Sequence, residues 1–185
     1  MVFSKCLNVY LKALEKYPVS TKMASGFAIV GSGDAFSQML IEKKPKLDVK
    51  RLLNITVYGS LISGGLSHFW YKGLDVVFGP SMTLKSSLKK ILVDQFVLTP
   101  PEIFCYMAWA HFGTGKTEPF FDKLKSDYFQ VLIVNYQMWL PLQFINFFYV
   151  PERHRVLFQC FFMMIWATFL SYASHNELNL AITSN

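Results

Sequence analysis

The segment 128–151, YFQVLIVNYQMWLPLQFINFFYVP, contains no formally charged residue. As an α-helix with a rise of about 1.5 Å per residue, it would cross the roughly 30 Å hydrocarbon core of a bilayer. Pro141 interrupts its hydrogen-bond pattern near the middle. Four amide side chains also lie within it: Asn135, Gln137, Gln143 and Asn146. The segment therefore predicts a membrane span whose polar groups need partners.

The composition favours a membrane protein over a soluble one. Of the 185 residues, 52% are hydrophobic and 16% are charged, whereas soluble domains are nearer a quarter charged. The net charge of +6 falls in short basic clusters between apolar runs, as in the flanks of membrane spans, which argues against nucleic-acid binding. The three cysteines are far apart in sequence, which favours a reducing compartment over a disulfide framework.

The apolar runs divide the chain into an all-α bundle of about four, possibly five, transmembrane helices. We predict one integral membrane domain over residues 1–185. Within this domain, an amphipathic helix that ends at Pro18 comes before the spans. Thr99-Pro100-Pro101-Glu102 is expected to break or kink the third span, and the polar stretch to Asp127 reads as a connection. The approximate spans are 19–41, 52–71, 91–112, 128–151 and 156–174.

Small residues predict close helix packing in the first two spans. Gly26, Gly33 and their small neighbours in the first span, and pairs such as Ser60/Gly64 in the second, let helix backbones approach closely. Asp34 and Gln38 are one turn apart on one face of the first span. Because an ionised carboxylate inside a membrane is costly, we expect Asp34 to face a partner, a water-filled cavity or the interface.

Polar side chains at membrane depth are the candidate functional groups. In one interpretation they line a hydrated passage, and in the other they join helices by hydrogen bonds while the acids pair with lysines at the rims, as Asp94 would with Lys89 or Lys90. His68 is expected in an aromatic belt at the membrane interface rather than in a proton relay. The candidate pore-lining or interhelix residues are Asp34, Gln38, Asp94, Gln95, Asn135, Gln143 and Asn146.

The sequence offers no convincing set for catalysis, a metal ion or a cofactor. Gly113-Thr114-Gly115-Lys116-Thr117 resembles part of a phosphate-binding loop, but Ala110 stands where that motif needs its first glycine. The four histidines lack metal-ligand spacing. We therefore expect a protein that is not an enzyme and that binds no cofactor or metal.

Several motifs together resemble a known family. They include Gly33-Asp34 with Ser37-Gln38, the pair Asp94-Gln95, and the block Trp139-Leu140-Pro141-Leu142-Gln143-Phe144-Ile145-Asn146 that leads to Pro151 and Arg155. The chain resembles the small organelle membrane proteins that include the peroxisomal protein of about 22 kDa and the mitochondrial inner-membrane Mpv-type proteins. Leu140 between Trp139 and Pro141 is similar to the peroxisomal branch, whereas Gly33-Asp34 and Tyr71-Lys72-Gly73 are closer to the mitochondrial one.

The resemblance implies an all-helical membrane protein of about four spans and, for the peroxisomal branch, a pore that passes small solutes with little selectivity. It names no catalytic residue. It implies structural roles for Trp139, Pro141, Pro151 and Arg155. Ala167 and Phe169, which stand where the family often has asparagine and tyrosine, depart from its last motif.

Together these observations predict a channel-forming, multi-pass protein of the peroxisomal membrane, with the mitochondrial inner membrane as the alternative location. The alternative function is a non-conducting membrane scaffold or an Mpv-type role in organelle homeostasis. The expected partners are the lipid bilayer, small-molecule solutes, further copies of the chain in a homo-oligomer and the peroxisomal membrane-protein import receptor. The basic connection from Lys43 to Arg51 is expected to contact that receptor or anionic lipid.

Overall fold

The fold was analysed in a computed structural model, which describes residues 2–79, 84–115, 119–150, 155–176 and 178. These residues are almost entirely helical, and no strand occurs among them. The elements are α1 (Val2–Lys16), α2 (Pro18–Phe36), η1 (Ser37–Ile41), α3 (Val49–Tyr58), η2 (Gly59–Leu66), α4 (Ser67–Phe78), α5 (Leu84–Val93), η3 (Asp94–Leu98), α6 (Thr99–Thr114), α7 (Phe120–Phe148) and α8 (Arg155–His175).

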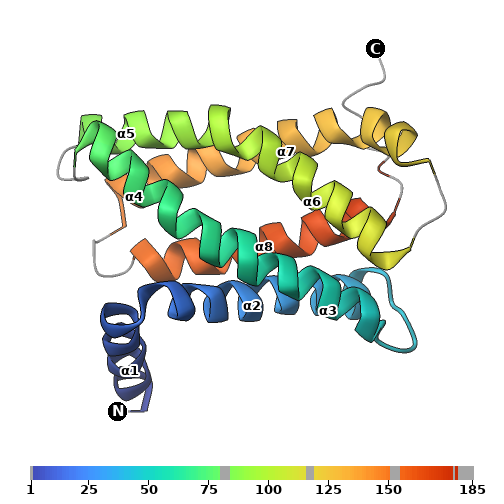
Figure 1. The fold of residues 1–185 in the computed structure, drawn as a ribbon, viewed down its shortest axis with the longest axis horizontal. Helices are drawn as coiled ribbons and strands as arrows, with labels where there is room; N and C mark the ends of the chain where they lie inside the picture. The colour runs from blue at the N-terminus through green and yellow to red at the C-terminus, as the bar shows by residue number, and fades with distance from the viewer. Residues whose placement is uncertain (1, 80–83, 116–118, 151–154, 177, 179–185) are drawn as a thin grey trace.

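Among the described residues, π-helical segments lengthen α-helices into rods. Element η1 extends α2, η2 joins α3 to α4, and η3 joins α5 to α6. Segment η3 lies directly before Pro100 and Pro101, which have no backbone N–H to donate, and the Thr99 hydroxyl donates to the carbonyl of Asp94 at 3.2 Å. The prolines do not break the helix, which passes through a π turn and continues to Thr114, but the rod bends between α5 and α6 in Figure 1, as the alternative prediction of a kink requires.

The predicted bounds shift in two other places. The second span lies within a rod that continues past Lys72 to Phe78, and α7 begins at Phe120, inside the stretch predicted as a connection. Pro119 precedes α7 as its N-cap, and the helix then runs through Pro141 without a break. Pro151 lies outside the described residues, whereas α7 ends at Phe148.

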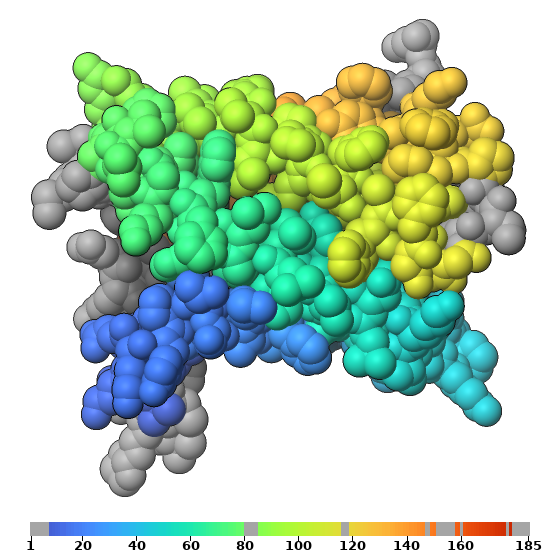
Figure 2. Space-filling model, in the orientation of Figure 1, coloured from blue at the N-terminus to red at the C-terminus, as the bar shows by residue number. Residues whose placement is uncertain are grey.

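The rods are arranged around a central space. In Figure 1, α2 and α8 lie together along one edge and α5 runs along the opposite edge, from which α6 slopes down toward α3. Helices α3 and α4 cross the front, and α7 lies behind. Helix α1 turns away from α2 at Tyr17 and Pro18. The gap between the ribbons of α4 and α6 is largely covered by side chains in the space-filling view of the same face (Figure 2).

Glycines set the closest contact in the bundle, between α2 and η2. A Cβ atom at Gly64 would lie 2.5 Å from the carbonyl oxygen of Lys22, and one at Gly26 would overlap the carbonyl of Gly59. Backbones can approach this closely because glycine has no side chain. The prediction that small residues form an association face in the first two spans is confirmed.

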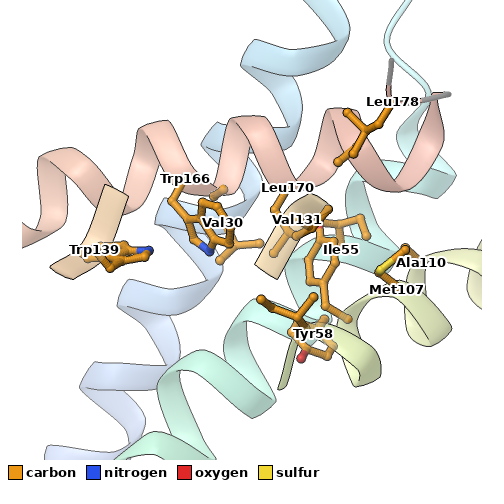
Figure 3. Close-up of a cluster of buried hydrophobic side chains, with 14 residues drawn as sticks. Val30, Ile55, Tyr58, Met107, Ala110, Val131, Trp139, Trp166, Leu170 and Leu178 are labelled. Carbon is orange, nitrogen blue, oxygen red and sulfur yellow. The ribbon is translucent and has the colours of Figure 1, made fainter. Parts of the chain in front are cut away.

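An apolar cluster packs between the rods. Tyr58 from α3, Val131 and Trp139 from α7, and Trp166 and Leu170 from α8 point toward one another in Figure 3, and all five are buried. Such buried contacts between elements that are distant in sequence hold the bundle together. All of these residues except Val131 also border the central space.

Many polar side chains are buried and many large apolar side chains are exposed. Among the described residues, fifteen apolar and sixteen polar or charged residues are buried, while thirty-two large apolar side chains are exposed. Val76 and Val77 of α4 are 81% and 71% exposed, whereas Asp34, Gln38 and Arg51 are buried completely or almost completely. In the part of the chain that is described, no individual helix has both the length and the apolar character needed to cross a membrane.

Candidate functional site: a polar central cavity

A cavity of about 570 Å³ lies among the rods. Its walls come from α2, from η2 and the neighbouring turns of α3 and α4, from the α5–α6 rod, from α7 and from α8. Four of the seven candidate residues lie on these walls: Asp94, Gln95, Asn135 and Gln143. The cavity therefore collects polar groups from helices that are far apart in sequence.

Asp94 is held by Trp70, which the sequence did not point to, and by its neighbour Gln95. Its carboxylate accepts a hydrogen bond from the indole of Trp70 at 3.0 Å and a longer one from the amide of Gln95 at 3.4 Å. Lys90, which was expected to pair with it, instead forms an ion pair with Asp75. The prediction of a Lys90–Asp94 pair within the helix is wrong, because Asp75 on α4 lies against Lys90 across the interface.

The cavity amides pair with one another between helices. Asn135 Nδ2 on α7 donates to Gln95 Oε1 on η3 at 2.8 Å. Gln159 Nε2 on α8 donates to Gln143 Oε1 on α7 at 3.2 Å. All four side chains also line the cavity, so the same amides connect helices and present polar atoms to its interior.

Other polar residues of the cavity were not among the sequence candidates. Lys22 Nζ of α2 lies 3.1 Å from His68 Nδ1 of α4, and both residues line the cavity. The structure thus places His68 on the cavity wall. Glu102 lines it too, two turns beyond Asp94 on the same rod. The helical spacing between Asp94 and Glu102 is the one sequence signal that could have placed Glu102 beside Asp94 on the same face. No sequence signal pointed to Lys22 or Gln159.

Asp34 and Gln38 belong to a separate, buried charged cluster. Arg51 Nε donates to Asp34 Oδ1 at 2.7 Å, and Gln38 Nε2 donates to Asp34 Oδ2 at 2.8 Å. Ser171 of α8 also donates to Asp34 Oδ1, the oxygen that Arg51 binds. The expectation that Asp34 faces a partner is confirmed, and the partner is Arg51. Neither Asp34 nor Gln38 is on the cavity wall.

Glu42 completes this cluster on its outer side. Arg51 binds it with two nitrogens, Nη1 to Oε2 at 2.9 Å and Nη2 to Oε1 at 2.7 Å, and the Ser37 hydroxyl donates to it at 2.9 Å. Burial alone raises the pKa of Glu42, but these hydrogen bonds and the charges of Arg51 and Lys44 outweigh it and lower the pKa to about 2. Glu42 is therefore ionised at any physiological pH.

The remaining candidates have other positions. Asn146 is buried on α7 but does not line the cavity, and its Oδ1 has no hydrogen-bond partner among the described residues. Trp139 is buried on the cavity wall, Pro141 is exposed within α7, and Arg155 is the first residue of α8. Within the described ranges, no three histidine, cysteine or acidic residues lie close enough to hold a metal ion.

Comparison with known proteins identifies relatives along nearly the whole chain. Residues 113–171 match the model of the Mpv17 / PMP22 family. The chain is 33% identical over 175 residues to "Peroxisomal membrane protein 2" of Bos taurus, covering 90% of this chain and 88% of that protein. It is 31% identical over 173 residues to "Mitochondrial inner membrane protein Mpv17" of Xenopus laevis, covering 92% and 97%. No solved structure matches the chain.

Proposed function

Because this chain belongs to the Mpv17/PMP22 family of membrane proteins, we propose that it spans an organelle membrane several times and gives small solutes weakly selective passage through its central cavity. The observation that carries the proposal is a cavity with charged and amide side chains on its wall, inside a protein that exposes many large apolar side chains. Polar and ionisable groups within membrane proteins usually face one another or a water-filled space, and here amides from different helices pair while lining the cavity.

The exposed apolar side chains support a lipid-facing exterior. Phe69, Val76 and Val77 of α4, like Phe96 and Val97 of η3, are more than half exposed. Soluble monomers rarely leave so many large apolar side chains in water, whereas a bilayer solvates them. The proposed bundle places these groups in the hydrocarbon and the amides in the interior.

The dimensions and chemistry of the cavity suit small metabolites of mixed type. A volume of about 570 Å³ lies within the roughly 300–1,000 Å³ of typical small-molecule sites. Its wall carries two carboxylates, Asp94 and Glu102, two lysines, Lys22 and Lys90, and several amides and aromatic rings. A wall with both signs of charge favours weak selectivity over recognition of one solute.

We propose the peroxisomal membrane as the location, with the mitochondrial inner membrane as the alternative. The Leu140-Pro141 arrangement supports the peroxisomal branch, and relatives from both organelles are similar to the chain to nearly the same degree. Fluorescent tagging of the chain in cells, with markers for both organelles, tests this. Exclusive mitochondrial signal would overturn the peroxisomal assignment and leave the family membership unchanged.

Assembly into a homo-oligomer and delivery by the peroxisomal import receptor are parts of the same proposal. The connection before α3 exposes Lys43, Lys46 and Lys50, which can contact an acidic receptor surface or anionic lipid. Arg51 was expected to act with them, but it is buried in the charged cluster and is not available. Replacing the three lysines by glutamine should impair targeting, and unchanged targeting would exclude this role.

Conductance in planar bilayers tests the passage. Purified wild-type protein should give discrete current steps, and Gln143→Leu should change their size because Gln143 lies on the cavity wall. Gln137→Leu is the matched control, since it makes the same substitution at an exposed position of the same helix. Asn146→Leu should also leave conductance unchanged, because Asn146 is not on the wall.

A non-conducting scaffold is the second candidate, and the satisfied amide pairs favour it. Gln95 with Asn135, and Gln143 with Gln159, join helices as structural bridges would. A scaffold predicts stable protein partners after solubilisation and no solute flux into liposomes. A folded wild-type protein without conductance would support the scaffold and exclude the channel.

A further inference from the structure

The cavity is open at one end and closed at the other. Around Lys22 and His68 several wall residues are half-buried, as are Gln143 and Gln159. At the opposite end they are all buried: Val30, Tyr58, Ile103, Tyr106, Ala167 and Leu170. A passage through the bundle needs two openings, and the described structure shows a blind end.

The Arg51 cluster lies directly behind that blind end. Asp34 follows the wall residue Val30 by one turn of α2, and Ser171 follows Ala167 by one turn of α8. Arg51 precedes Tyr58 by two turns of the α3 rod. Three of the rods that form the wall thus converge on the cluster, and Arg51, Asp34 and Ser171 are each no more than 1% exposed.

The outer side of the cluster is close to the surface. Arg51 extends from Asp34 to Glu42, and Glu42 in turn pairs at 3.3 Å with Lys44, whose side chain is 35% exposed. A single layer of polar side chains therefore separates the blind end from the connection between η1 and α3. On the cavity side, the buried side chain of Tyr106 lies on the wall and close to Asp34, Arg51 and Ser171 of the cluster.

We infer that the cluster of Arg51, Asp34 and Ser171 is a closed gate across the proposed passage, and that Arg51 is the residue whose displacement opens it. The inference rests on the proposed function and adds its regulation. A buried ion pair often adds no more stability than well-packed apolar groups of similar volume, so its presence here is consistent with a role in switching. When the Arg51 side chain turns toward Glu42 and away from Asp34, it leaves the layer of polar side chains between the cavity and the surface, and the passage opens.

Solute flux from liposomes tests the gate. Ser171→Ala removes the hydroxyl that bonds to both Asp34 and Arg51 (Nη2 to Oγ, 3.0 Å), and Asp34→Asn removes the charge that holds Arg51. Thr168→Val is the matched control on the same helix, because it removes a hydroxyl that bonds within α8 to the carbonyl of Met164. The readout is release of sucrose, with trapped high-molecular-weight dextran as the control for leaking vesicles.

The gate predicts that Ser171→Ala and Asp34→Asn raise sucrose release by about tenfold, since each weakens hydrogen bonds to a charged group, while Thr168→Val behaves as the wild type. Release at one common rate from the wild type and all three variants overturns the gate and leaves the channel intact. No release from any of the folded proteins overturns both. If Asp34→Asn does not fold, as judged by circular dichroism and size-exclusion chromatography, Ser171→Ala decides.

Discussion

Arg51 Nε donates a 2.7 Å hydrogen bond to Asp34 Oδ1, and the two side chains, 1% and 0% exposed, fasten α3 to α2. The same guanidinium binds both oxygens of Glu42, so one cation lies between two carboxylates. Such bidentate, charge-assisted bonds are strong and geometrically specific. Ser171 and Gln38 satisfy further acceptor positions on Asp34, which makes its burial tolerable.

Replacing Arg51 should destabilise the fold severely. Arg51→Met leaves Asp34 buried without its cation, and breaking a buried pair in this way costs about 3–5 kcal/mol of unfolding free energy. Thermal or denaturant unfolding in detergent micelles measures the loss. Lys50→Met is the control, because Lys50 is exposed and such substitutions usually stay within about 0.5 kcal/mol. Equal losses in the two variants would contradict the structural role of the pair.

Acid should weaken the protein through Glu42. Its pKa is about 2 in the folded protein against an ordinary value of 4.5, so the unfolded chain takes up the proton first as pH falls. The stabilisation from ionised Glu42 is complete above about pH 4.5 and is lost as the pH falls toward about 2. Melting temperatures measured between pH 6 and pH 3 should therefore decrease.

Glu42→Gln separates this contribution from other acid effects. The variant should be less stable than the wild type at pH 6 and should lose less stability over the same acid range, because its side chain does not titrate. Its melting curve is compared with that of the wild type at each pH. Parallel slopes for the two proteins would show that Glu42 does not carry the acid response.

Sequence patterns anticipated the features that arise within one helix or between small residues. The four-residue spacing put Asp34 beside Gln38, and the glycines of the first two spans predicted the close approach of α2 and η2. Both follow from helix geometry alone. The prediction that Asp34 needs a partner followed in the same way from the cost of burying a carboxylate.

The partners themselves depend on how distant helices meet, which spacing does not encode. Arg51 stood in a basic connection and suggested a surface cluster, yet the approach of Ser171 from α8 encloses it. Lys90 had the correct spacing for Asp94, but Asp75 competes for it from α4. The cavity likewise combines Lys22 with His68, which are 46 positions apart. Helical periodicity predicts the face of the helix on which each residue lies. It does not predict which other helix packs against that face.

The glycine contacts predict opposite effects for two alanine substitutions. Gly64→Ala should lower the unfolding free energy by about 1–3 kcal/mol, because the new Cβ would lie 2.5 Å from the carbonyl of Lys22 and the backbones would have to separate. Gly73→Ala should raise it by up to about 1 kcal/mol, since nothing lies within 4 Å and alanine favours the helix. Unfolding in detergent measures both, and a stabilising Gly64→Ala would exclude the close packing of α2 and η2.

For the Gln95–Asn135 pair, a coupling free energy can distinguish a structural bridge between helices from a hydrated lining of the cavity. If the 2.8 Å bond between these amides acts as a bridge, a double-mutant cycle with Gln95→Met and Asn135→Leu should give a coupling of about 0.6 kcal/mol, and at most about 1.7. Gln137→Met, on an exposed position of α7, replaces Gln95→Met in the control cycle and should give additive effects. The coupling is obtained from unfolding free energies of the wild type, both single variants and the double variant. Strictly additive losses at Gln95 and Asn135 would mean that cavity water satisfies each amide when its partner is removed. These residues would then act as a hydrated lining, and the bridge would contribute no stability.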